Sequence, residues 1–191
     1  MAVGYYGAGR PCGGHFYTMV DAIQQYVRGA VFVKGVPSVS STDTSGIANA
    51  TTIAKSSSMT VLVIGTDLGT AHEGHDAVNL TLSPAQLLLV ESVAQAAHKP
   101  VTVVLMSAVP LDLTQLLAND KIGAILHVGQ PSVQCLGVGD VLFGKVSPAG
   151  RTVQVSAPLP CARCDWFLDL ALICCRHFTQ NHSSISSQFS I

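Results

Sequence analysis

Short apolar runs recur along the chain, and segments of helical periodicity separate them. The runs occupy residues 30–33, 60–64, 101–106, 122–127 and 152–155. A short, nearly charge-free run rich in β-branched residues is typical of a strand that is buried on both faces, as in a parallel sheet. Strands that alternate with helices at this spacing predict an α/β fold, with a mainly parallel, doubly wound sheet and helices on both of its faces.

Four of the intervening segments predict helices over residues 16–28, 46–55, 113–118 and 138–143. A fifth segment, which begins at Ser83, has the strongest helical signal, and Ser83 is a typical N-cap residue.

The helix that begins at Ser83 carries more than one start signal. Pro84 suits the first helical position, and Gln86 stands where a capping box places its second polar partner. Pro100 ends the segment. The residues expected on its buried side are Leu87, Leu88, Val90, Val93, Ala94 and Ala97.

The periodic pattern stops near residue 156. We therefore predict one α/β domain over residues 4–156, followed by a poorly ordered tail over 157–191 that shows no sustained strand or helix period. The 48% of hydrophobic residues are ample for a core, although only 11% of the residues are charged.

The net charge and the short apolar runs argue against several classes of partner. The formal net charge is −1 and no Lys/Arg cluster occurs, so neither nucleic acid nor an acidic membrane surface is an expected partner. No apolar run approaches the ~20 residues of a membrane span. The first residues do not have the pattern of a secretory signal, which leaves the localisation open. Three N-glycosylation sequons occur, at Asn49, Asn79 and Asn181.

The polar loop that follows the run at 60–64 holds most of the candidate chemistry. It carries Asp67, His72, Glu73, His75 and Asp76. Ligands of open α/β sheets bind beyond the carboxyl ends of the strands, so we expect this loop at the binding edge. Glu73, between two histidines, is the leading candidate for a general acid or base, and a solvated loop glutamate is the alternative.

Other chemical readings of the sequence are weaker. The histidines and carboxylates of the loop match no established metal-ligand spacing, so no metal and no cofactor are predicted. The loop lacks the glycine patterns of nucleotide sites, and Ser107 lacks the G-x-S-x-G elbow of a hydrolase serine. Cys161 and Cys164, with further cysteines and histidines beyond, suggest zinc, but an incidental cluster is the favoured interpretation.

Several stretches together resemble one known family. They are GYY at 4–6, PC at 11–12, GTD at 65–67, EGHD at 73–76, VNLTL at 78–82, AAHKPVTVVLMS at 96–107, NDKIGAIL at 119–126, DVLFG at 140–144 and SPAGR at 147–151. In this order the sequence resembles the carboxyl-side α/β domain of glycoside hydrolase family 3, in the branch of plant-type β-xylosidases and α-arabinofuranosidases.

The resemblance implies a fold, a site and an activity. It implies a doubly wound sheet that forms one wall of a sugar site, and retaining hydrolysis of xylan or arabinoxylan outside the cell or in the cell wall. By position it assigns the acid/base role to Glu73 and contacts with substrate to Asp67 and Asp76. The sequence departs from the family pattern at Ala71, where the first glutamate of an E-x-E pair would stand, at Ala77, and at Gln130, where the pattern has an aromatic residue.

The family also implies what this chain needs from elsewhere. Its nucleophilic aspartate belongs to a preceding barrel domain, and a retaining glycosidase requires two carboxyl groups about 5–5.5 Å apart. We therefore expect the isolated chain to be inactive. Its expected partners are a xylo- or arabino-oligosaccharide and a glycosidase barrel in trans. The alternatives are a non-catalytic carbohydrate-binding or interaction module and, by fold analogy alone, a flavodoxin-like nucleotide-binding domain.

Overall fold

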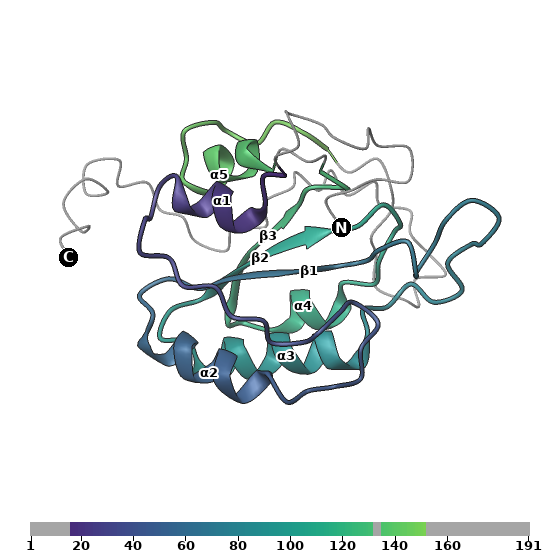
Figure 1. The fold of residues 1–191 in the computed structure, drawn as a ribbon, viewed down its shortest axis with the longest axis horizontal. Coiled ribbons are helices and arrows are strands. Elements are labelled where there is room, and N and C mark those ends of the chain that lie inside the picture. Colours follow the sequence, from purple (N-terminus) through teal and green to yellow (C-terminus); the bar gives the residue numbers. More distant parts are fainter. Residues whose placement is uncertain (1–15, 132–134, 152–191) are drawn as a thin grey trace.

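The computed structural model describes residues 16–131 and 135–151 (Figure 1). The predicted strand at 152–155 and the predicted tail at 157–191 lie outside these residues. The helices are α1 (Met19–Gln24), α2 (Ile47–Ser56), α3 (Pro84–Ala96), α4 (Thr114–Ala118) and α5 (Leu136–Leu142), and the strands are β1 (Val61–Gly65), β2 (Val101–Met106) and β3 (Ile122–His127).

The three strands form a parallel sheet in the order β1-β2-β3. The helix α3 connects β1 to β2 and α4 connects β2 to β3, as parallel neighbours require. The central strand β2 is almost fully buried, and Val103, Val104 and Leu105 have no exposed surface. A strand covered on both faces cannot alternate polar with apolar residues, which explains its continuous apolar run.

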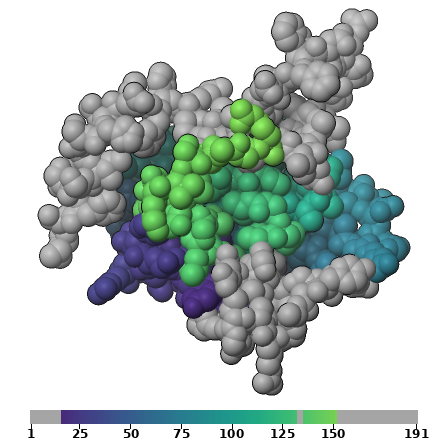
Figure 2. Space-filling view, turned by 90° about the horizontal axis from the view of Figure 1, so that it is seen from above, coloured from purple at the N-terminus to yellow at the C-terminus, as the bar shows by residue number. Residues whose placement is uncertain are grey.

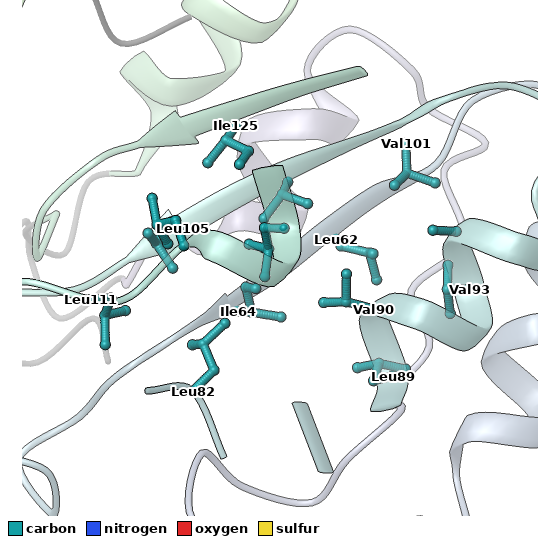
Figure 3. Packing of buried hydrophobic residues seen from close by; sticks show 14 of the residues in the cluster. Leu62, Ile64, Leu82, Leu89, Val90, Val93, Val101, Leu105, Leu111 and Ile125 are labelled. Carbon is teal, nitrogen blue, oxygen red and sulfur yellow. The ribbon is translucent and has the colours of Figure 1, made fainter. Parts of the chain in front are cut away.

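Helices cover both faces of the sheet, as the sequence predicts (Figure 1). On one face, α2, α3 and α4 enclose the larger part of the core, in which Val90 and Val93 of α3 pack with Leu62 of β1 (Figure 3). On the other face, Met19 and Cys135 pack with Val104. Among the described residues, no helix combines the length and the apolar character needed to cross a membrane.

The helices α1 and α5 lie side by side although they are far apart in the sequence (Figures 1 and 2). The ring of Tyr26 stacks on Phe143 with 4.6 Å between the ring centroids. The Tyr26 hydroxyl donates a hydrogen bond to Asp140, and this bond lowers the pKa of Asp140 and raises that of Tyr26. Lys145 Nζ, 3.4 Å from Asp140 Oδ1, completes an exposed polar cluster.

The boundaries of β1, β2 and β3 agree closely with the prediction, but residues 30–33 do not form a strand. Val31 and Phe32 are 71% and 67% exposed, and this segment has no strand partner in the described part of the chain. The prediction of a strand here was wrong. Strand preference depends on neighbours that pair with the backbone and cover the side chains, and an apolar run of this length does not supply them.

The buried side of α3 also differs from the prediction. Leu89 and Gln86 are buried, whereas Leu88 is 46% exposed. Residues 87–90 are all apolar, so the sequence does not fix which side of the helix faces the sheet. Ser83 does accept a hydrogen bond from the backbone N–H of Gln86, as predicted, but the Gln86 side chain does not cap the helix.

Candidate functional site

The carboxyl ends of the three strands meet at one edge of the sheet, and the loop after β1 extends from that edge. This segment, residues 66–80, is called the β1 loop below. It projects well beyond the sheet in Figure 1 and lies at the rim of the molecule in Figure 2. The structure therefore places the titratable loop where the sequence predicts it, at the edge where α/β proteins bind ligands.

The base of the β1 loop is fixed by buried hydrogen bonds to the neighbouring strand ends. Thr66 is 4% exposed, and its backbone N–H donates to the Met106 carbonyl at 2.9 Å. Its hydroxyl lies 3.0 Å from the hydroxyl of Ser107. The side-chain amide of Gln130 donates to the Thr66 carbonyl at 3.2 Å. The residue after β1 is thus tied to the segments that follow β2 and β3.

Asp67 stabilises the first turn of the β1 loop. Its carboxylate accepts the N–H of Gly69 at 2.9 Å, and its carbonyl accepts the N–H of Thr70 at 3.0 Å. The side chain is only partly exposed. One Asp67 oxygen is therefore committed to the loop itself. The other has no hydrogen-bond partner among the described residues and can accept a bond from a ligand at the sheet edge.

Glu73 lies at the tip of a tight turn in the same loop. His72 and His75 exchange two backbone hydrogen bonds of 3.0 and 2.9 Å across this turn. Their imidazole rings stack with 5.1 Å between centroids. Gly74 has φ +78°, a left-handed conformation that a glycine adopts without strain. Glu73 is thus an exposed residue on a turn that backbone hydrogen bonds hold together.

The three candidate carboxylates therefore share one loop but not one environment. Asp67 is at the partly buried base, whereas Glu73 and Asp76 are exposed farther out. The described residues contain no group of three or more His, Cys, Asp or Glu side chains that could hold a metal ion. Chemically, this loop offers carboxylates for proton transfer or for hydrogen bonds to hydroxyl groups.

Ser107, the residue considered as a nucleophile, lies in a buried and hydrogen-bonded position. Ser107 is 1% exposed, and its hydroxyl donates to the Val109 carbonyl at 2.7 Å. This hydrogen bond is typical of a residue that stabilises a loop rather than of a nucleophile. The cysteine cluster that includes Cys161 and Cys164 lies outside the described residues.

The sequence interpretation missed the role of Gln86, which is 2% exposed. Its side-chain oxygen accepts the N–H of Gly65 at 2.9 Å, and its amide nitrogen donates to the carbonyls of Gly65 and Val39, both at 3.0 Å. Gln86 thereby links α3, the end of β1 and the segment before α2. A polar residue spaced three and four positions before Leu89 and Val90 was the signal that could have revealed this buried position.

Replacing Gln86 with Leu is expected to destabilise the domain by about 2–4 kcal/mol, because the buried backbone of Gly65 and the partly buried carbonyl of Val39 lose their partners. Urea unfolding, monitored by circular dichroism, measures the loss of unfolding free energy. The matched control is Gln95→Leu, the same change at an exposed position of α3, for which a change within about 0.5 kcal/mol is expected. Equal effects of the two substitutions would contradict the assigned role of Gln86.

A separate hollow of about 320 Å³ opens beside the end of β3. His127, Ser147 and Pro148 contribute to its lining, together with apolar residues of α5. Burial lowers the pKa of His127, so the neutral imidazole is favoured there. The carboxylates of the β1 loop do not line this hollow.

Comparison with known proteins adds the family. The family model described as "Glycosyl hydrolase family 3 C-terminal domain" matches residues 2–158. Probable beta-D-xylosidase 7 of Arabidopsis thaliana is 37% identical over 145 residues, which are 75% of this chain and 18% of that protein. Beta-xylosidase/alpha-L-arabinofuranosidase 2 of Medicago sativa subsp. varia is 37% identical over 121 residues, or 63% of this chain and 16% of that protein.

A solved structure agrees with these relatives. A family 3 exo-β-xylosidase in complex with a xylobiose aziridine activity-based probe superposes with a TM-score of 0.71 and 26% identity, over 82% of this chain and 20% of that one.

The fold and the matches define the class of protein: an α/β domain of the kind found in family 3 glycosidases. The chain belongs to the glycosyl hydrolase family 3 C-terminal domain family. It spans 18% or less of the length of the first curated relatives that it matches.

Proposed function

We propose that this chain supplies the acid/base wall of a retaining β-xylosidase or α-L-arabinofuranosidase site that acts on xylan or arabinoxylan. In this proposal Glu73 is the catalytic acid/base, while Asp67 and Asp76 bind sugar hydroxyls. The single observation that carries it is the exposed Glu73 on an ordered turn at the carboxyl edge of the sheet, within a domain of the family 3 type.

The proposed chemistry needs a second carboxyl group. In a retaining glycosidase the nucleophile and the acid/base lie about 5–5.5 Å apart on either side of the scissile bond. Ala71, two residues before Glu73, has no carboxyl group to offer. We therefore assign the nucleophile to a barrel domain, which a longer polypeptide or a separate chain would provide.

The 191-residue chain by itself is expected to give no measurable turnover of aryl β-xylosides, because the proposal assigns the nucleophile to a barrel domain. Addition of a separately expressed family 3 barrel domain is expected to restore weak activity, measured by release of the phenol. Robust turnover by the chain alone that persists in Glu73→Gln would contradict both the role of Glu73 and the need for a second domain.

The alternative function is a non-catalytic carbohydrate-binding module. The exposed positions of Glu73 and Asp76 favour it, because carboxylates at a surface that a sugar can reach suit reversible hydrogen bonding to sugar hydroxyls. Binding of xylo-oligosaccharides by the chain alone, together with no activity when a barrel domain is added, would select this alternative.

A further inference from the structure

We propose that Asn79, on the return limb of the β1 loop, is an N-glycan acceptor in the folded protein, and that the sequon at Asn49 is not. The modification would attach the oligosaccharide of a lipid-linked pyrophosphate donor. This inference concerns a different residue from the candidate carboxylates and does not depend on the proposed glycosidase activity.

The conformation of Asn79 suits an acceptor. Asn79 Oδ1 accepts hydrogen bonds from the backbone N–H of Thr81 at 3.0 Å and from the Thr81 hydroxyl at 2.9 Å. Within the described part of the chain, its Nδ2 donates no hydrogen bond and so remains available. The sequon threonine is thus already folded back onto the asparagine that it accompanies.

The surroundings of Asn79 leave space for a glycan. Asn79 is exposed, and the preceding residue, Val78, is 94% exposed. The chain is held in place directly after Asn79, because the Leu80 carbonyl accepts the N–H of Asp112 at 2.7 Å and Leu82 is 2% exposed. A projecting asparagine on an anchored segment is reachable without unfolding of the domain.

The sequon at Asn49 is a natural control within the same molecule. Asn49, Ala50 and Thr51 all lie inside α2. The Thr51 hydroxyl donates to the Ala48 carbonyl at 2.8 Å instead of to Asn49. To adopt the geometry seen at Asn79, this segment must leave its helix. The third sequon, at Asn181, lies outside the described residues.

The transfer reaction has a defined balance. The Asn79 Nδ2 attacks C1 of the donor sugar, the new N–C1 bond forms, and the C1–O bond to the lipid pyrophosphate breaks. The lipid pyrophosphate leaves with the bonding electron pair, and the proton from Nδ2 passes to a base of the transferase. The two hydrogen bonds to Oδ1 stabilise the negative charge that gathers on this oxygen as Nδ2 loses its proton.

The test uses the folded 191-residue chain, a purified eukaryotic oligosaccharyltransferase and a dolichyl-pyrophosphate-linked oligosaccharide, with occupancy read at each site by peptide mass spectrometry. We expect Asn79 to be modified at least about tenfold faster than Asn49, because Asn49 must first open out of α2. After urea unfolding and dilution into the assay, the two rates should approach each other.

Two substitutions separate chemistry from loop structure. Asn79→Asp keeps an oxygen that accepts both hydrogen bonds from Thr81 but removes the nucleophilic nitrogen, so it should abolish modification while circular dichroism stays unchanged. Thr81→Val removes the hydroxyl at similar volume and should also abolish it. Modification of Asn49 as fast as Asn79 in the folded chain, or no modification of folded Asn79, would overturn the proposal.

Discussion

Replacement of Glu73 with Gln is expected to lower kcat for phenyl β-xyloside by about 10²–10⁴-fold, the usual contribution of a general acid–base group. The suitable enzyme is a chimaera in which residues 4–156 replace the matching domain of a plant β-xylosidase. Glutamine keeps the size and hydrogen-bonding capacity of the side chain but cannot give a proton to the departing oxygen. Release of phenol under saturating substrate measures kcat.

The dependence on the leaving group distinguishes acid catalysis from simple disruption. A dinitrophenolate is already a stable anion, so the step that forms it needs little protonation, and Glu73→Gln should cost much less with dinitrophenyl β-xyloside than with phenyl β-xyloside. The matched control is Glu91→Gln, the same change at an exposed position of α3, which should leave both rates unchanged. An equal loss with both substrates would remove Glu73 from the acid role.

Substitution of Gly65 with Ala is expected to cost about 3 kcal/mol or more of unfolding free energy. Gly65 ends β1 with φ +152°, and a Cβ built there would lie 1.8 Å from the Met106 carbonyl oxygen. That oxygen cannot move away freely, because it accepts the N–H of Thr66. Both the backbone conformation and the space therefore oppose any side chain. Urea unfolding, or loss of soluble folded protein, reports the effect.

Two other glycines separate these causes. In Gly74→Ala the new Cβ would have no atom within 4 Å, but the residue would keep φ +78°. Only the conformational cost of about 1–2 kcal/mol is therefore expected. In Gly137→Ala, within α5, the new Cβ would also have no atom within 4 Å, and the backbone φ is not positive. This substitution should be neutral or stabilise the helix by up to about 1 kcal/mol. If all three substitutions had similar effects, the close contact at Gly65 would not matter.

Local pattern alone determined most of the described fold. Residues 101–106 and 122–127 form strands with the predicted boundaries, and α3 begins at Pro84 after Ser83. These features depend on interactions between residues close in sequence, or on the continuous apolar character that a doubly covered strand requires. For the same reason the sequence located the β1 loop at the carboxyl edge of the sheet.

Only the tertiary structure decided which neighbours each segment meets. Residues 30–33 have the composition of a strand, but no strand pairs with them in the described part of the chain. On α3, Leu88 is exposed and Leu89 is buried, although the helical pattern predicted Leu88 on the buried side. Gln86 has the local context of a helix cap, yet its amide satisfies the backbone of Gly65 because burial makes unpaired N–H and carbonyl groups costly. Such contacts join residues far apart in the chain, so their energy is absent from any short window of sequence.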